Sequence, residues 1–157
     1  MTNSDTPFRY TADLIGGFAD AGCTVAFISP GSRSTPLTLA LARDPRIDDI
    51  SIRDERSAAF AALGYAKATG TPAIIVCTSG SAAAHYLAAI VEADQSVTPL
   101  IVLTADRPAR LRGTGAPQTM DQTRLYGPHV KTFVELDPAS PNSSGRDDAA
   151  ALYAAAV

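Results

Sequence analysis

The sequence has few cysteines, few aromatic side chains, no tryptophan and no excess of positive charge. Two cysteines, Cys23 and Cys77, cannot form a disulfide framework or a structural zinc site. No apolar run approaches the ~18 residues of a membrane span, and the N-terminus lacks the basic and apolar regions of a secretory signal. A net charge of -3 argues against binding to nucleic acid or to an anionic membrane. We therefore expect a cytoplasmic protein without a nucleic-acid partner, an integral membrane segment or a metal site in this chain.

What the sequence does have is the composition of one globular domain. Hydrophobic residues make up 46% of its 157 residues and charged residues 18%, so the chain can bury a substantial core. Disorder is excluded as the default state.

Short apolar runs alternate with longer stretches of helical character. The runs are residues 24–28, 50–53, 73–77, 100–104 and 130–134. The first four begin about 25 residues apart, which is the length of one strand, one crossover helix and two turns. This spacing predicts an α/β fold with an open parallel β-sheet, right-handed crossovers and helices on both faces.

Capping residues and glycines mark where the helices begin and end. We predict helices at residues 6–22, from 35 onward, and at 56–70, 80–95 and 146–157, with a functional loop at 107–127 that contains one or two short helical turns. We take residues 1–137 as the domain and 138–157 as a linker and the start of a truncated helix. Because that helix has no cap at residue 157, we expect the chain to be the front part of a longer protein.

Polar residues follow four of the predicted strands. These stretches are residues 29–34, 54–57, 78–81 and 105–108. In open parallel sheets ligands bind at the carboxyl ends of the strands. One polar strand end is an ordinary turn, but four together indicate a binding site.

Each polar group at the strand ends has a functional and a purely structural interpretation. Arg33 suits a carboxylate, or it is a solvated side chain in a turn. Glu55 is a carboxyl group that holds or shares a proton in a reaction, or it is a first-turn residue stabilised by the helix dipole. Residues 78–80 offer backbone N–H groups to an anion, or they form an N-cap. Arg107 and Gln118 belong to a loop that binds an acidic small molecule, or to a solvated charged loop.

The polar stretches occur in an order that resembles a known family. The motifs are ISPGSRSTPL at 28–37, DERSAAF at 54–60, CTSG at 77–80, LTADRP at 103–108 and QTMDQ at 118–122. They resemble the N-terminal pyrimidine-binding domain of the 2-succinyl-5-enolpyruvyl-6-hydroxy-3-cyclohexene-1-carboxylate synthases. The resemblance covers about residues 8–136 and implies the thiamine-diphosphate-binding fold.

Enzymes of this family decarboxylate 2-oxoglutarate and add the succinyl-semialdehyde unit to isochorismate in menaquinone biosynthesis, using thiamine diphosphate and a divalent metal, Mg²⁺ or Mn²⁺. The resemblance implies that Glu55 is catalytic and hydrogen-bonds N1′ of the cofactor's aminopyrimidine. We assign Thr78, Ser79 and Gly80 to cofactor binding as well. The substrate contacts implied by the resemblance are Ser32, Arg33, Arg107 and Gln118.

Two departures from the family pattern limit what the chain can do. The family has Gly-Ala-Asn-Gln where this chain reads Gly115-Ala116-Pro117-Gln118, and proline lacks both the amide side chain and a backbone donor. The Gly-Asp-Gly…Asp-Asn motif that holds Mg²⁺ and diphosphate in the family is absent from these 157 residues. We therefore expect this chain alone to be inactive and the active enzyme to be a homodimer or homotetramer.

Two other functions fit parts of the sequence. One is the pyrimidine-binding subunit of a split thiamine-diphosphate 2-oxoacid decarboxylase, which the short chain favours. The other is a non-enzymatic, flavodoxin-like binding module, which explains the polar strand ends but not their combination. The GSRSTPL loop and the Asp-Arg-Pro segment favour the synthase.

Overall fold

The computed structural model describes residues 6–138 and 144–157, and this part contains a four-stranded parallel sheet in the order β2-β1-β3-β4. The strands are β1 (Val25–Ile28), β2 (Asp48–Ser51), β3 (Ala73–Cys77) and β4 (Leu100–Thr104). The α-helices are α1 (Thr6–Ala21), α2 (Thr35–Arg43), α3 (Glu55–Thr69), α4 (Leu87–Gln95) and α5 (Gly145–Ala156). Four short 3₁₀ helices are η1 (Ser32–Ser34), η2 (Gly80–Tyr86), η3 (Ala109–Leu111) and η4 (Gly127–His129). The predicted α/β fold is confirmed.

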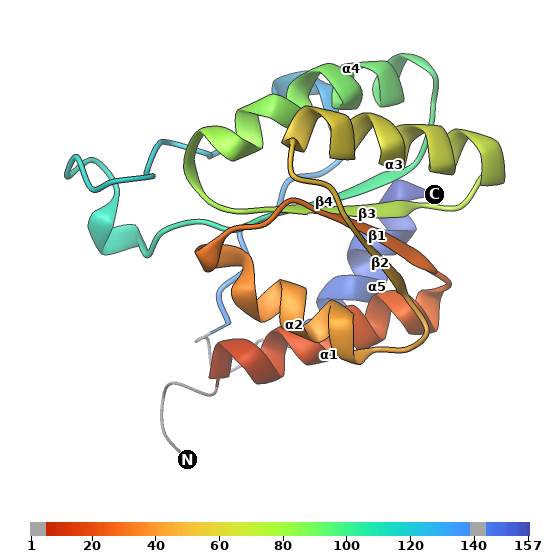
Figure 1. Cartoon of the computed structure of the whole chain (residues 1–157), viewed down its shortest axis with the longest axis horizontal. Coiled ribbons are helices and arrows are strands. Elements are labelled where there is room, and N and C mark those ends of the chain that lie inside the picture. The colour runs from red at the N-terminus through yellow and green to blue at the C-terminus, as the bar shows by residue number, and fades with distance from the viewer. Residues whose placement is uncertain (1–5, 139–143) are drawn as a thin grey trace.

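The sheet lies between two layers of helices (Figure 1). Helices α3 and α4 cover one face, and α1, α2 and α5 cover the other. The two central strands, β1 and β3, are buried along their whole length. Alternate residues of these strands point into different cores, so that Ile74 and Val76 face α1 while Ile75 and Cys77 face α3. Small alanines on α3 allow it to pack closely on its face of the sheet.

The sequence placed most elements within a few residues. Strands β3 and β4 have the predicted bounds, whereas β2 begins two residues before the predicted run because its register with β1 pairs Asp48 with Val25. The predicted helix at 80–95 begins as the 3₁₀ helix η2 and becomes α-helical only at Leu87.

The predicted strand at 130–134 is wrong. These residues are irregular, and Phe133 and Val134 are exposed. Their side chains find partners without a strand ladder: Val130 packs against the core beside α3 and α4, and the Arg124 guanidinium lies 6.0 Å from the centre of the Phe133 ring. An apolar run becomes a strand only where its backbone hydrogen-bonds to a neighbouring strand, and the four-stranded sheet of the described residues does not include this run.

Helix α5 packs on α1 in the same core as the sheet. Ala149 is fully buried, and the Tyr10 hydroxyl donates a hydrogen bond to the Asp148 carboxylate at 2.5 Å. The domain boundary at residue 137 stays a prediction. Among the described residues, no helix combines the length and the apolar character that crossing a membrane requires.

Candidate functional site

The candidate site lies where the loops after β1 and β3 meet. Strand β2 is added to the sheet on one side of β1, and β4 is added on the opposite side, next to β3. The direction in which strands are added therefore reverses between β1 and β3. Such a switch point at the carboxyl ends of the strands is the usual ligand-binding position in open α/β sheets. The loops that follow β1 and β4 project from this end of the sheet, at the left of Figure 1.

The loops after β1 and β3 touch each other at Gly31. A Cβ atom on Gly31 would lie 2.2 Å from the Cβ of Thr78, a separation that real side chains do not adopt. Glycine is therefore required here for close approach of the two backbones. This contact places Ser32 and Arg33 beside the 78–80 stretch.

Arg33 connects the first loop to the distant loop at 107–127. Its Nη1 atom donates to Ser32 Oγ at 3.0 Å and to Gln118 Oε1 at 3.1 Å. Both partners are neutral oxygens, and Arg33 has no ion-pair partner within residues 6–138 and 144–157. Ser32 and Gln118 are exposed to solvent. The positive charge of Arg33 is therefore available to an anion that enters from solvent.

Gln118 is also tied to the stretch after β3. Its Nε2 atom donates to Thr78 Oγ1 at 3.0 Å, and its carbonyl oxygen accepts from Ser79 Oγ at 2.8 Å. Gln118 has a φ of 58°, which a non-glycine residue adopts rarely and which these contacts hold in place. We call Ser32, Arg33, Thr78, Ser79 and Gln118 the strand-end cluster. Residues expected to contact substrate and residues expected to contact cofactor thus form one hydrogen-bonded group.

Glu55 lies at the first turn of α3, four positions after the last residue of the edge strand β2. Asp54 caps this helix by accepting from the Ser57 backbone N–H at 2.8 Å, which fixes the start of α3. The Glu55 carboxylate is half-buried, and it has no hydrogen bond or ion pair in the described parts of the chain. Burial raises the pKa of the Cys77 thiol to about 12, and the nearby Glu55 charge adds to the increase. Glu55 is thus near the end of β3 but not bonded to the strand-end cluster.

Arg107 stands at the carboxyl end of β4 with part of its guanidinium unsatisfied. Its side chain is half-buried, and its Nε atom is buried without a hydrogen-bond partner in the described part of the chain. Its backbone N–H donates to the Asp106 carboxylate at 2.6 Å. A buried guanidinium nitrogen without a partner is costly unless a ligand satisfies it.

Arg112, on the same loop, is already neutralised. Its Nη2 atom lies 2.9 Å from Asp106 Oδ2 and also pairs with Glu135. Burial raises the pKa of Asp106, and the Arg112 charge opposes that increase. The Nε atom of Arg112, like that of Arg107, is buried without a partner in the described chain, so the two arginines differ in their ion pairs: Arg112 is paired with Asp106 and Glu135, whereas Arg107 has no ion pair among the described residues.

Sequence reasoning assigned no role to Gln122, which the structure buries beneath the site. Its Oε1 atom accepts from the Gly80 backbone N–H at 2.9 Å, and its Nε2 atom donates to the Ala105 carbonyl at 3.1 Å. Its only signal in the sequence was its place in the QTMDQ motif.

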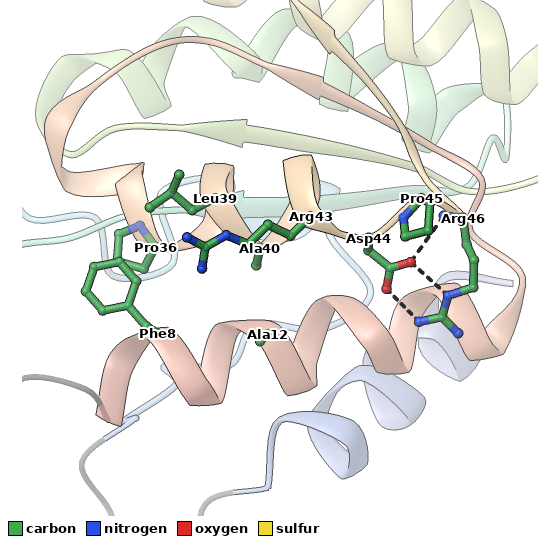
Figure 2. A pocket seen from close by; sticks show the side chains of 9 residues that line it. All are labelled: Phe8, Ala12, Pro36, Leu39, Ala40, Arg43, Asp44, Pro45 and Arg46. Atoms are coloured by element: carbon green, nitrogen blue, oxygen red, sulfur yellow. Dashed lines mark hydrogen bonds and ion pairs between the residues drawn. The ribbon is translucent and has the colours of Figure 1, made fainter. Parts of the chain in front are cut away.

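A separate pocket of about 330 Å³ lies between α1 and α2. Figure 2 shows Phe8 and Leu39 at one end, and the Asp44–Arg46 pair at the other, with the Arg43 side chain between them. None of the predicted site residues lines this pocket. It is distinct from the strand-end cluster.

Comparison with known proteins identifies the family of this domain. The family described as "Thiamine pyrophosphate enzyme, N-terminal TPP binding domain" matches residues 9–125. This range includes β1 to β4, the strand-end cluster, Glu55 and Gln122.

Curated proteins named 2-succinyl-5-enolpyruvyl-6-hydroxy-3-cyclohexene-1-carboxylate synthase are similar to the chain. The protein of Geobacillus kaustophilus is 58% identical over 127 residues, which are 81% of this chain and 22% of that protein. That of Listeria innocua is 53% identical over 145 residues, 92% of this chain and 25% of that protein. That of Roseiflexus sp. is 55% identical over 136 residues, 87% of this chain and 23% of that protein. The chain spans about a quarter of the length of these relatives.

Proposed function

The chain belongs to the thiamine pyrophosphate enzymes as their N-terminal TPP-binding domain, and we propose that it serves a 2-succinyl-5-enolpyruvyl-6-hydroxy-3-cyclohexene-1-carboxylate synthase. The reaction would decarboxylate 2-oxoglutarate and add its succinyl-semialdehyde unit to isochorismate. The observation that carries this proposal is the hydrogen-bonded strand-end cluster, which joins Arg33 to Gln118 and Gln118 to Thr78.

The residues after β2 and β3 fit the pyrimidine half of thiamine diphosphate. Glu55 offers a half-buried carboxylate with no hydrogen-bond partner among the described residues, so it is free to bond a ring nitrogen. Thr78, Ser79 and Gly80 are buried directly after β3, whose last residue, Cys77, is close enough to Glu55 to feel its charge. They would hold the ring from the β3 side. When bound, the cofactor supplies the carbanion chemistry of the reaction. The role that we assign to Glu55 is to hold or share a proton at N1′ of the pyrimidine ring.

The strand-end cluster and Arg107 fit anionic substrates. Both proposed substrates carry carboxylates, and guanidinium groups bind carboxylates through charge-assisted hydrogen bonds. Arg33 meets only neutral oxygens, and Arg107 has a buried nitrogen without a partner in the described chain. Ser32 and Gln118 would add neutral hydrogen bonds. Pro117, exposed beside Gln118, contributes no side-chain donor.

The remaining parts of the proposal lie outside these 157 residues. We propose that Mg²⁺ or Mn²⁺ and the diphosphate group are held by another domain of the same enzyme. A cytoplasmic location is part of the same proposal.

We expect the complete enzyme that carries this chain to consume isochorismate only when 2-oxoglutarate, thiamine diphosphate and a divalent metal, Mg²⁺ or Mn²⁺, are all present. The measurement is isochorismate loss by absorbance, with the product identified by mass spectrometry. The isolated 157-residue chain serves as the control: we expect no turnover, and only very weak binding of thiamine diphosphate by titration calorimetry, because phosphate contacts normally carry much of the affinity.

Two results would contradict this function. Decarboxylation of a 2-oxo acid without isochorismate consumption would favour the split decarboxylase. Micromolar binding of thiamine diphosphate by the isolated chain would mean that this domain does not depend on a separate diphosphate site.

We also propose that a two-fold dimer interface forms around Phe60 on α3 and Leu87 at the start of α4. Phe60 on α3 is 42% exposed, and Leu87 at the start of α4 is 40% exposed. Gly64 follows Phe60 by one helical turn and has open space at its Cβ position, which allows a second helix to approach closely. Exposed apolar groups on adjacent helices are typical of a surface that another subunit covers.

We expect the chain to dimerise at tens of micromolar and Phe60→Asp to make it monomeric, because a buried charge without a partner opposes association. Light scattering measures the mass. Phe8→Asp is the matched control, since Phe8 is 43% exposed but lies on α1, on the other side of the sheet. A monomeric wild type, or equal loss of dimer in both variants, would rule out this interface.

A further inference from the structure

The side-chain amide of Gln122 connects two loops of the candidate site. Only 9% of the residue is exposed. Its oxygen accepts from the Gly80 N–H at 2.9 Å, and its nitrogen donates to the Ala105 carbonyl at 3.1 Å. A buried amide that satisfies a donor in one loop and an acceptor in another fixes the separation of those loops.

Each of the two bonded backbone groups adjoins a residue of the proposed site. Gly80 ends the 78–80 stretch and begins η2 with a φ of 84°, a conformation that favours glycine. Ala105 lies two residues before Arg107, and its own N–H donates to the Cys77 carbonyl at 3.0 Å. The amide of Gln122 therefore holds the loop after β3 against the loop after β4.

Gln122 also anchors the segment that presents Gln118. The two residues are four positions apart, and Gln118 is bonded to Thr78 and Ser79. A Cβ on Gly80 would lie 3.1 Å from the carbonyl carbon of Gln118, so the two backbones are in close contact. The 118–122 segment is thus bonded at both ends to the stretch after β3.

We propose that Gln122 is a positioning residue, which sets Gly80, Arg107 and Gln118 at the mutual distances that substrate binding needs. This inference rests on the proposed function for the identity of the substrates. Gln122 is buried beneath the loops and its amide bonds backbone groups only, so it acts through the residues that it holds.

The chemistry of the amide makes this inference testable by substitution. Gln122→Met keeps the length of the side chain and loses both hydrogen bonds. Gln122→Glu keeps the acceptor for Gly80, but an ionised carboxylate sets an oxygen against the Ala105 carbonyl and cannot donate. Protonation restores the donor, and burial favours the protonated form by raising the pKa of the introduced carboxyl group.

The experiment compares these variants in the complete enzyme. We expect Gln122→Met to raise the KM for isochorismate about tenfold, the size expected when buried groups lose a hydrogen bond, with a smaller change in kcat. The defect of Gln122→Glu, relative to wild type, should diminish as the pH falls from about 8 to about 6, because the carboxyl group then donates again. The Gln122→Met defect should not depend on pH.

Hydrogen exchange supplies a readout that does not depend on turnover. Followed by mass spectrometry, peptides that contain Gly80 should exchange faster in Gln122→Met, because the Gly80 N–H loses its acceptor. The matched control is Gln95→Met, which changes an exposed glutamine at the end of α4. We expect wild-type KM and exchange from that control.

The results separate this inference from the proposed function. If wild type does not use isochorismate, the proposed function fails, while faster Gly80 exchange still supports the hydrogen bond. An unchanged KM in Gln122→Met, or a lowered melting temperature with an unchanged KM, would overturn the positioning role. If Gln122→Met does not fold, a Gln122→Glu defect that is independent of pH would overturn it as well.

Discussion

Glu55→Gln in the complete enzyme should lower kcat by about 10²- to 10⁴-fold, the range that a positioned acid–base group contributes. The reason is that glutamine keeps the size of the side chain and can still hydrogen-bond N1′ of the aminopyrimidine, but it cannot exchange a proton with that nitrogen. The melting temperature should stay near that of wild type. The Glu55 carboxylate has no hydrogen bond or ion pair to lose within the described residues, and the amide leaves no cavity.

The decisive measurement for Glu55 is the rate at which the C2 proton of bound thiamine diphosphate exchanges into deuterated water, followed by NMR. We expect slow exchange in Glu55→Gln and wild-type exchange in Glu92→Gln, which makes the same chemical change at an exposed position of α4. If Glu55→Gln exchanged its proton as fast as wild type, Glu55 would have no part in the reaction.

The sequence was most informative where local pattern and tertiary environment agree. Residues 73–77 form an unbroken apolar, β-branched run, and such a run is stable in a parallel sheet covered on both faces. The end of α3 was readable because Gly70, with a φ of 72°, closes it, whereas its start was predicted at residue 56 and lies at Glu55, after the Asp54 cap. These signals depend on neighbours in the chain and need no knowledge of the fold.

The prediction at 130–134 failed because a strand also needs backbone hydrogen bonds to a neighbouring strand, which local pattern does not encode. The run contains Val130 and Phe133, but these side chains are satisfied by the core and by Arg124. The 3₁₀ start of the 80–95 helix was also missed, and here the Gly80 N–H donates to Gln122, 42 residues away in the sequence, a contact that local pattern does not encode.

The gathering of the polar strand ends could be predicted from the sequence, but the contacts among their side chains could not. Polar strand ends in a parallel sheet must gather at one edge, so Arg33 and Thr78 were expected to be near each other. The bond from Arg33 to Gln118 spans 85 residues and depends on the path of the 107–127 loop. Gln122 has no charge and no special spacing, so only the structure shows that it joins two loops.

Arg33→Ala and Arg107→Ala should each lower kcat/KM for isochorismate and 2-oxoglutarate while cofactor binding stays intact. Loss of a charge-assisted hydrogen bond costs about 1.5–3 kcal/mol, which is roughly ten- to hundredfold in kcat/KM. The two substitutions should differ in their effect on the melting temperature of the enzyme. Arg33 bonds Ser32 and Gln118, whereas the buried Nε of Arg107 has no partner among the described residues. Removing Arg107 should therefore leave the melting temperature of the enzyme unchanged or slightly higher.

Arg43→Ala is the control for the arginine variants, because it removes the same charge from α2, in the pocket of Figure 2 and outside the strand-end cluster. We expect wild-type kinetics from it, so that a general effect of net charge on anionic substrates is accounted for. Steady-state kinetics in each substrate, with calorimetry for thiamine diphosphate, separate the roles. An arginine variant that lost thiamine diphosphate would belong to the cofactor site. A variant with the same kinetics as Arg43→Ala would show that the substituted arginine does not contact substrate and serves folding alone.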